Sequence, residues 1–274
     1  MKKKFKLILT LLFLAMGTTV FSMAEKSGDI RICTYNIRGD LPHDGINSWI
    51  YRKDSLCKII NRHDFDIICM QEVLANQLSD IEEKTGYTFV GIRGLYNPIF
   101  YKKDKFELLH TEVFWLSDSM DLFSKGWDGM YDRYCVWAKF RDRLSNKIFY
   151  VFNTHLDHKG KIAQREGAKL VCREAVKFAK DAPIFICGDM NSLDTTDAYK
   201  EFVNYFKDSR TIAKTIEGPL GTAHNFGKVA PVRIDYIFVS KKIKVLYYGV
   251  EDESYPNGFF PSDHYAVFVD VKIK

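Results

Sequence analysis

Runs of apolar residues of strand length recur along this chain, separated by short polar turns and by a few stretches of helical spacing. Several runs are continuous and rich in β-branched residues, a pattern typical of strands that are covered on both faces. We predict strands at 30–36, 65–71, 88–92, 98–101, 107–115, 135–140, 148–154, 183–187, 234–239, 244–250 and 265–271.

Three other stretches place apolar side chains on one helical face, and they predict helices at 49–61, 161–180 and 196–206. The segment 115–137 has little periodicity and predicts an ordered loop near one end of the sheets. Many strands with a few interspersed helices predict a layered α/β or α+β domain. Because no linker, charge block or repeat interrupts residues 28–274, we expect a single domain over 25–274.

The composition excludes a disordered protein and gives an ambiguous first indication of partners. Of the 274 residues, 46% are hydrophobic and 27% are charged, which is enough apolar material for a full core. The formal net charge of +5 would by itself favour a nucleic-acid partner. The position of the charges changes that interpretation.

The first 24 residues carry most of the excess positive charge. Four lysines precede an uncharged run at 7–16 and small residues up to Ala24, a pattern that predicts a secretory signal peptide at 1–24. Its loss would take the basic residues from 40 to 36 against 35 acidic ones, so a broad cationic surface for duplex DNA loses its main support. We expect a periplasmic or extracellular protein. The alternative is a retained anchor, although the run is shorter than the ~20 residues of a membrane span.

The cysteines lie in apolar, strand-like or helical stretches, without the spacing of a metal site. We therefore expect buried free thiols, and the alternative for an exported protein is that some of them pair. The six residues are Cys33, Cys57, Cys69, Cys135, Cys172 and Cys187.

Polar side chains suited to metal or phosphate binding lie at the ends of many predicted strands. One such residue is usually a turn or cap residue. A recurrence at six places in chain order is difficult to attribute to turns. The residues are Asn36, Glu72, His155 with Asp157, Asp189 with Asn191, Asp235, and Asp263 with His264.

Seven segments, in this order, resemble the endonuclease/exonuclease/phosphatase superfamily, which includes deoxyribonucleases, AP endonucleases, deadenylases, sphingomyelinases and inositol-polyphosphate 5-phosphatases. They are TYNIR (34–38), DIICMQEV (66–73), NPIFYKKD (97–104), FNTHLDH (152–158), ICGDMNS (186–192), RIDYIFVS (233–240) and SDHYAV (262–267). The resemblance implies a four-layer α/β/β/α sandwich, in which two mainly antiparallel sheets pack face to face with helices outside.

A divalent cation is the cofactor that this resemblance implies. Glu72 offers the hard carboxylate oxygen that suits Mg²⁺, or Mn²⁺ in its place, and by resemblance it is the main ligand with Asn36 beside it. By the same resemblance Asp263 either reaches the metal through water or pairs with His155.

The resemblance also distributes catalytic roles. Asp189 takes the proton from the attacking water or orients it, and Asn191 holds that water or a phosphate oxygen, with both side chains on one side if the backbone stays extended. His264 donates to the phosphate and Asp235 orients its ring. His155 gives a second phosphate contact or acts as the acid, and the sequence leaves open which histidine is the proton donor.

Further residues are candidates for substrate contact, each with a structural alternative. These alternatives are a turn, an ion pair, a solvated rim or an ordinary loop. The residues are Asn97, Arg133, Asp157, His158 and His224. Trp115, Trp127 and Trp137 could stack bases, but core packing or loop anchoring is the stronger expectation.

These observations predict a Mg²⁺-dependent phosphodiester hydrolase, nuclease-like and, by resemblance to deadenylases, a 3′–5′ exonuclease. One alternative is a phosphomonoesterase or a sphingomyelinase-like lipid phosphodiesterase that uses the same site. Another is a phosphate-binding protein with a dead site. We expect a monomer with no stable protein partner and no transmembrane span in the mature chain. The sequence leaves open the substrate, endo or exo cleavage, and one or two metals.

Overall fold

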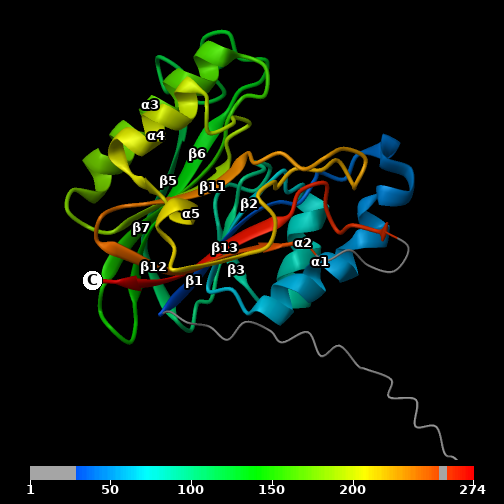
Figure 1. The fold of residues 1–274 in the computed structure, drawn as a ribbon, viewed down its shortest axis with the longest axis horizontal. Helices are drawn as coiled ribbons and strands as arrows, with labels where there is room; N and C mark the ends of the chain where they lie inside the picture. The colour runs from blue at the N-terminus through cyan, green and yellow to red at the C-terminus, as the bar shows by residue number, and fades with distance from the viewer. Residues whose placement is uncertain (1–28, 253–257) are drawn as a thin grey trace, which may run out of the picture.

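Two β-sheets pack face to face with helices on their outer sides in the computed structural model of this chain (Figure 1). The structure describes residues 29–252 and 258–274. The predicted signal peptide at 1–24 lies outside the described residues. Within the described part, no helix combines the length and the apolar character that a membrane crossing requires.

The first sheet places β1 at its centre, parallel to β2 and antiparallel to β13. In this register Asn36 lies opposite Gln71, so both parallel strands end at the same edge. The strand order is β10 (Thr215–Glu217), β12 (Ile243–Glu251), β13 (Ala266–Ile273), β1 (Ile30–Asn36), β2 (Ile67–Gln71), β4 (Ile99–Tyr101) and β3 (Thr88–Val90).

The second sheet brings three predicted site residues into register. β7 runs parallel to β8 and pairs His155 with Asp189, and β11 runs antiparallel to β8 and pairs Asp235 with Asp189. The strand order is β5 (Phe106–Trp115), β6 (Tyr134–Asp142), β7 (Ile148–His155), β8 (Ile184–Asp189), β11 (Asp235–Val239) and β9 (Lys207–Asp208).

Helices cover the outer face of each sheet. On the first sheet, α1 (Trp49–His63) and α2 (Ala75–Thr85) pack through buried residues such as Leu56 and Ile81. On the second, α3 (Lys161–Ala179) and α4 (Asp197–Tyr205) pack through residues such as Val171 and Phe202. Two short helices complete the described part: η1 (Pro42–Asn47), which precedes α1, and α5 (Ser209–Ile212), which contacts β11 and β12.

A third apolar cluster fills the space between the sheets, with contributions such as Ile32 and Val269 from one sheet and Phe149 and Val151 from the other. The molecule thus has the four predicted layers. Both sheets are mixed. Most neighbouring strand pairs of the described residues are antiparallel, and the parallel ones are β1 with β2, β7 with β8 and β10 with β12.

Several elements differ from the sequence prediction. The helix α2 was not predicted, because its sequence ANQLSDIEEKT is mostly polar and buries only Gln77, Leu78 and Ile81. The short strands β9 and β10 carry no continuous apolar run. All six cysteines are buried and free, as predicted. Trp137 is also buried, stacked on Phe178, which confirms a packing role.

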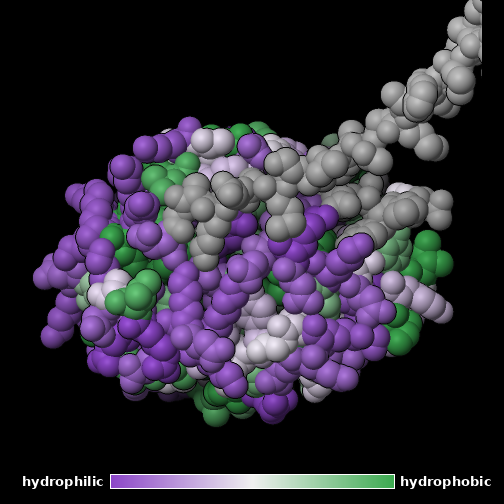
Figure 2. All heavy atoms as spheres, turned by 90° about the horizontal axis from the view of Figure 1, so that it is seen from below, coloured by the Kyte–Doolittle hydropathy of each residue, from purple (hydrophilic) through white to green (hydrophobic). Residues whose placement is uncertain are grey.

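One face of the molecule shows how polar and apolar side chains are distributed on the surface. The face shown in Figure 2 is mostly hydrophilic, and its hydrophobic side chains occur in small separated groups. Scattered apolar residues of this kind are normal on folded domains. The cavities and the charged side chains that line them are therefore the candidate functional sites.

Candidate active site

The carboxyl ends of β1, β2, β7 and β8 meet at one edge of the sandwich, where a cavity of about 630 Å³ opens. Side chains carried at these ends converge because parallel strands end at the same edge of a sheet. The cavity is lined by Arg38, Gly39, Leu41, Glu72, Leu74, Tyr96, Asn97, Tyr131, Asp132, Arg133, Tyr134, His155, His158, Asp189, Asn191, Asp263 and His264.

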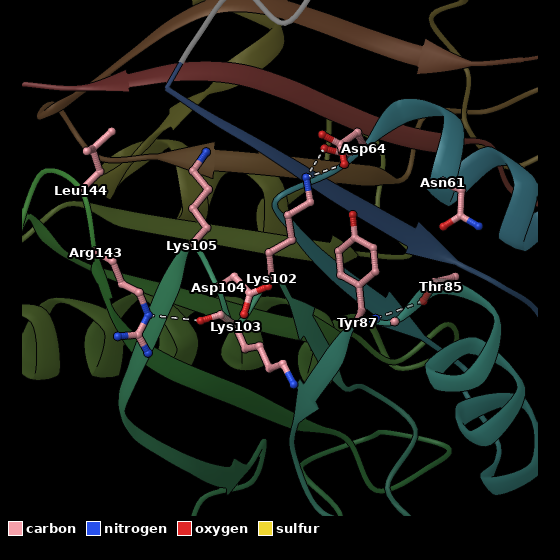
Figure 3. Close-up of a pocket in the computed structure, with 11 residues that line it drawn as sticks. Asn61, Asp64, Thr85, Tyr87, Lys102, Lys103, Asp104, Lys105, Arg143 and Leu144 are labelled. Carbon is pink, nitrogen blue, oxygen red and sulfur yellow. Dashed lines mark hydrogen bonds and ion pairs between the residues drawn. The ribbon is translucent and has the colours of Figure 1, made fainter.

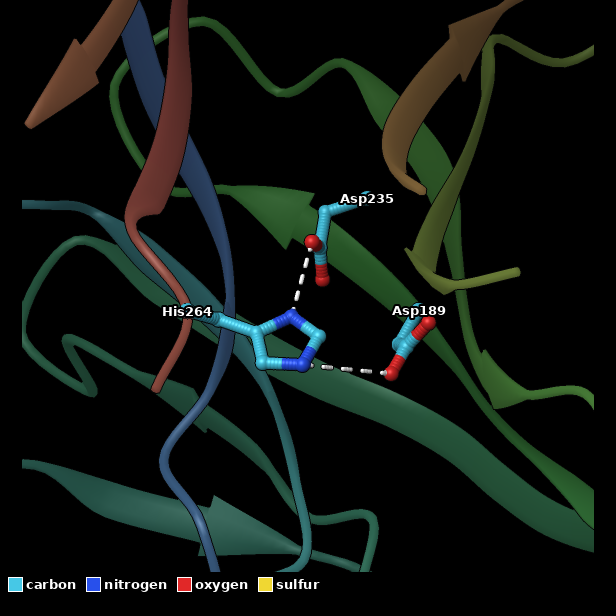
Figure 4. Close-up of side chains that lie close together, drawn as sticks. All are labelled: Asp189, Asp235 and His264. Carbon is cyan, nitrogen blue, oxygen red and sulfur yellow. Dashed lines mark hydrogen bonds and ion pairs between the residues drawn. The ribbon is translucent and has the colours of Figure 1, made fainter. Parts of the chain in front are cut away.

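His264, which lines this cavity, lies between two carboxylates (Figure 4). Its Nδ1 is 2.9 Å from Oδ2 of Asp235, and its Nε2 is 3.8 Å from Oδ2 of Asp189. Asp235 is fully buried, and its Oδ2 also accepts a hydrogen bond of 2.5 Å from the hydroxyl of Thr222. The imidazole is thus held through Nδ1, so that Nε2 faces Asp189.

The pKa values of the two histidines of the site are shifted in opposite directions. Burial disfavours the cation of His264, but the charges of Asp235 and Asp189 outweigh this effect and raise its pKa well above the usual value. Burial, together with the positive charges of Arg133 and His264, lowers the pKa of His155 well below the usual value. At neutral pH His264 is therefore a cation and His155 is neutral.

Asp189 is the point at which the site residues meet. Its Oδ2 is 3.4 Å from Nε2 of His155 and accepts a hydrogen bond of 3.1 Å from the amide of Asn36. Burial first, and then the nearby charge of Asp235, raises the pKa of Asp189 to about 7, although the His264 cation opposes the rise. A carboxylate with such a pKa can exchange a proton near neutral pH.

Asn191 reaches the cavity by a turn of the chain. The strand β8 ends at Asp189, and Asn191 adopts the left-handed region with φ 46°. The extended backbone that would place both side chains on one side is therefore not present. Instead the backbone N–H of Asn191 donates to Oδ1 of Asp189 (2.9 Å), and its side-chain amide donates to the carbonyl of Leu156 (3.0 Å).

Glu72 follows β2 directly, and its φ of 63° turns its carboxylate into the cavity. One carboxylate oxygen accepts from the Asn36 amide (2.9 Å), and the other accepts from the backbone N–H of Gly39 (3.1 Å). Each oxygen has a further lone pair. Asp263 also lines the cavity, and burial and the charge of Glu72 raise its pKa, although the His264 cation opposes the rise.

Glu72 and Asp263 both line the cavity, and their carboxylate oxygens are the ligands that suit a hard divalent cation. Arg38 lies 3.8 Å from Asp263 but is bound chiefly to Asp44. Asn36 does not present an oxygen here, since its amide nitrogen faces Glu72 and Asp189 while its oxygen accepts from the N–H of Arg38. In this orientation Asn36 positions the carboxylates.

A second group, formed by Asp189, Asp235 and His264, also has ligand atoms close enough to hold a metal. In this group Nδ1 of His264 is hydrogen-bonded to Asp235, so Nε2 is the ring nitrogen that faces Asp189. Glu72 and Asp263, which also line the cavity, are the other candidate for a cation site.

Three of the predicted substrate residues lie at the cavity. Asn97, Arg133 and His158 all line the cavity. The guanidinium of Arg133 lies over the ring of Tyr131, and its buried Nε has no hydrogen-bond partner among the described residues. The ring of His158 stacks on Tyr131 at 5.6 Å, which gives the mouth of the cavity an aromatic surface.

Two predicted substrate residues do not line the cavity. Asp157 is 2% exposed, and its carboxylate accepts hydrogen bonds from four backbone N–H groups, of Met130, Tyr131, Lys159 and Gly160. His224 is 1% exposed, stacks on Tyr265 and accepts at Nδ1 from the N–H of Gly227. Both side chains therefore hold loops that border the site.

Comparison with known proteins agrees with this geometry. The model of the endonuclease/exonuclease/phosphatase family matches residues 33–264. The chain belongs to this family. Its members are phosphoric ester hydrolases that generally use divalent metals, so a phosphoester substrate is implied.

Two solved bacterial structures are similar over almost their whole length. One is an endonuclease/exonuclease/phosphatase from Bacteroides vulgatus, 35% identical with a TM-score of 0.84, covering 89% of this chain and 99% of that one. The other is a mannosyl-6-phosphatase from Bacteroides thetaiotaomicron, 32% identical with a TM-score of 0.84, covering 88% of this chain and 99% of that one.

Among curated relatives, protein angel of Drosophila melanogaster is 25% identical. The match covers 89% of this chain and 80% of the relative. The 3′–5′ exoribonuclease subunit Ccr4 of the CCR4-Not complex from Aspergillus oryzae is 24% identical. That match covers 83% of this chain but only 44% of the relative.

Some residues of this family site were not predicted. Thr222 binds Asp235 but lies in a loop without any motif, so the sequence held no signal for it. Arg38 follows Asn36 within the motif TYNIR, which could have indicated it. Tyr131 lies in the aperiodic segment between β5 and β6, where spacing carries no information.

A second cavity, of about 740 Å³, lies at the opposite edge of the first sheet, near the start of β2 and the end of β4 (Figure 3). It is basic, but its cations are mostly engaged. Lys102 lies 2.6 Å from Asp64, Lys105 lies 2.8 Å from Asp66, and the Nε of Arg143 donates to the carbonyl of Lys103. It lacks the histidines and clustered carboxylates of the family site.

Proposed function

We propose that this chain is a Mg²⁺-dependent phosphoric ester hydrolase and that its preferred substrate is a phosphomonoester of a sugar or a similar small polar molecule. Mn²⁺ would substitute. The observation that carries the proposal is the position of Asp189, which faces the neutral His155, the cationic His264 and the Asn36–Glu72 pair in one cavity.

The residues divide the reaction as follows. Glu72 and Asp263 would hold the cation, which supplies charge neutralisation at the phosphate when bound. Asp189 accepts the proton of the attacking water, a role that suits a carboxylate with a raised pKa. The Nε2 of His264 donates to a phosphate oxygen, while Asp235 and Thr222 keep Nδ1 protonated and the ring in place.

The neutral His155 and Asn191 complete the phosphate contacts. We propose that the neutral His155 donates one hydrogen bond through its protonated ring nitrogen to a phosphate oxygen, because a ring with so low a pKa is a poor acid for the leaving oxygen. Asn191 is held by Leu156 at the rim, where its side chain can orient the water or a phosphate oxygen.

Two observations support a monoester. The mannosyl-6-phosphatase from Bacteroides thetaiotaomicron is 32% identical across nearly its whole length, and its name specifies a phosphorylated sugar. Arg133 adds a cation to the lining of the cavity, which suits the second charge of a phosphomonoester dianion.

The phosphodiesterase expected from the sequence, with 3′–5′ exonuclease action, is the second candidate. It is supported by the exoribonuclease relatives and by the aromatic surface of Tyr131 and His158, on which a base could stack. A sphingomyelinase-like activity and a binding protein with a dead site have no such specific support.

A substrate panel tests these candidates. The purified protein, stripped with EDTA and reloaded with Mg²⁺ or Mn²⁺, is assayed on mannose 6-phosphate, a bis-phenyl phosphodiester, oligoadenylate with a free 3′ hydroxyl, and sphingomyelin vesicles. We expect cation-dependent release of phosphate from the sugar phosphate. Faster cleavage of oligoadenylate or sphingomyelin would favour the corresponding diesterase, and binding without turnover would favour a dead site.

The cellular location and oligomeric state are further proposals. We propose that residues 1–24 direct export and are removed, and that the mature chain is a monomer. Amino-terminal sequencing of the protein recovered from the periplasm or the medium tests the first. Light scattering of the same material tests the second.

A further inference from the structure

Arg52, in the first turn of α1, is fully buried, although it lies outside the cavity of the active site. Arginine is rarely fully buried unless it is paired with a carboxylate. Among the described residues, however, no carboxylate forms an ion pair with Arg52. A cation in this environment must be satisfied by other groups, and burial accordingly lowers its pKa.

Backbone carbonyls surround the guanidinium instead. The Nε donates to Asn47 (2.7 Å), one terminal nitrogen donates to Ile37 (2.5 Å) and Pro261 (3.0 Å), and the other donates to Arg38 (2.6 Å) and Gly39 (3.3 Å). The five N–H donors of the group thus meet five carbonyl acceptors. The guanidinium also lies over the rings of Trp49 and Phe226.

The carbonyls at 37–39 belong to the loop that leads out of β1, and the opposite side of the same loop faces the site. The N–H of Gly39 donates to Glu72, and the N–H of Arg38 donates to the side-chain oxygen of Asn36. Arg38 has a φ of 57°, a conformation that needs support from its surroundings. Arg52 binds the carbonyls of this loop on the side away from the site. The backbone N–H groups of the loop therefore point at Asn36 and Glu72.

The fifth carbonyl connects a distant part of the chain. Pro261 directly precedes Ser262, whose hydroxyl donates to the carbonyl of Asn36 (2.6 Å), and then Asp263 and His264. Arg52 therefore joins the segment that supports Glu72 to the segment that carries Asp263 and His264.

We propose that Arg52 is a positioning residue, whose guanidinium sets the separation of the Glu72 and Asp263 carboxylates and thereby the cation affinity of the site. The flat fork of five donors is what this arrangement requires, and lysine, with three donors on one nitrogen, cannot reproduce it. The inference rests on the proposed function in so far as these two carboxylates hold the cation.

The test compares Arg52→Met and Arg52→Lys with Arg31→Met. Arg31 is a matched control because it is also buried, at the other end of β1, where it forms a bidentate pair with Asp270. Mn²⁺ affinity is measured by calorimetry on the metal-free proteins, together with kcat, KM and Tm. Residues that orient metal ligands typically contribute roughly 10–100-fold in affinity or activity.

We expect Arg52→Met to weaken Mn²⁺ binding at least about 10-fold and to lower kcat more than it raises KM, and Arg52→Lys to recover part of both. Arg31→Met should lower Tm and leave the Mn²⁺ affinity of the folded protein unchanged. An unchanged affinity in a folded Arg52→Met overturns the proposal. If that variant does not fold, an unchanged affinity in Arg52→Lys overturns it.

A second readout separates this proposal from the proposed function. If the unsubstituted protein binds no Mn²⁺, the cation role of the site fails, and Arg52 is then judged by the amide resonance of Gly39. That amide should lose protection from hydrogen exchange in the Arg52 variants and keep it in Arg31→Met, because its bond to Glu72 depends on the loop. Equal protection in all variants overturns the positioning role.

Discussion

Two cavities of similar size lie at opposite edges of this sandwich, one of about 630 Å³ and the other of about 740 Å³, and both are lined by charged residues. At the larger one, Lys102 and Lys105 neutralise Asp64 and Asp66. At the smaller one, the carboxylates of Glu72, Asp189 and Asp263 all line the cavity, and the pKa of Asp189 is raised. Clustered carboxylates with a raised pKa, and not cavity size, therefore mark the candidate functional edge.

The largest effect that this comparison predicts is at Asp189. Asp189→Asn keeps the shape but removes the proton acceptor, so kcat should fall by about 10²–10⁴-fold while the protein stays folded. Steady-state kinetics and a thermal melt measure both quantities. Near-normal turnover in the folded variant would show that the carboxylate is not the base.

Glu72→Gln should weaken the cation site by roughly 10–100-fold, an effect of the size expected when a group at a metal site is lost. The substitution removes the negative charge, while the hydrogen bond from Gly39 has an oxygen to remain on. A Mg²⁺ titration of the rate gives the activation constant. If its midpoint does not change, Glu72 is not the cation ligand.

The raised pKa of Asp189 predicts the pH profile. The base must be deprotonated, so kcat/KM should fall about tenfold per pH unit once the pH drops below the pKa of Asp189. That pKa lies above the ordinary carboxyl range. The raised pKa of His264 keeps its cation at neutral pH and moves the alkaline limb upward. Rates measured from pH 5 to 9 test this, and a flat profile below neutrality contradicts it.

Thr222→Val should have a smaller effect. The hydroxyl donates to Asp235, which orients His264, and a hydrogen bond of this kind contributes about 0.5–1.5 kcal/mol. We expect kcat to fall about threefold to tenfold. Thr222→Ser keeps the hydroxyl and serves as the control, so an equal loss in both variants would indicate a packing effect.

The ion pairs at the larger cavity should contribute to stability and not to catalysis. Lys105→Met removes a partner of the buried carboxylate of Asp66, which should cost about 1–3 kcal/mol of unfolding free energy and leave kcat and KM unchanged. Urea unfolding and the standard assay measure these. A substantial loss of activity at unchanged stability would end the contrast between the two edges.

Much of the fold was predictable because its strands are buried on both faces and form continuous apolar runs. The helix α2 escaped because it needs only one narrow apolar contact, through Leu78 and Ile81, and is otherwise polar. At the site, the family motifs indicated the residues that follow the strand ends. They could not indicate Thr222, which reaches Asp235 from a loop without periodicity.

The sequence by itself determined the layered strand pattern, the family and the candidate residues of its site, because each of these is written in local runs and short motifs. Only the tertiary structure decided their states and neighbours. Register places Asp189 beside His155 and Asp235, and burial then separates a neutral histidine from a cationic one. Charge interactions depend on distance and burial, so residues far apart in the chain acquire them only when the sheets are packed.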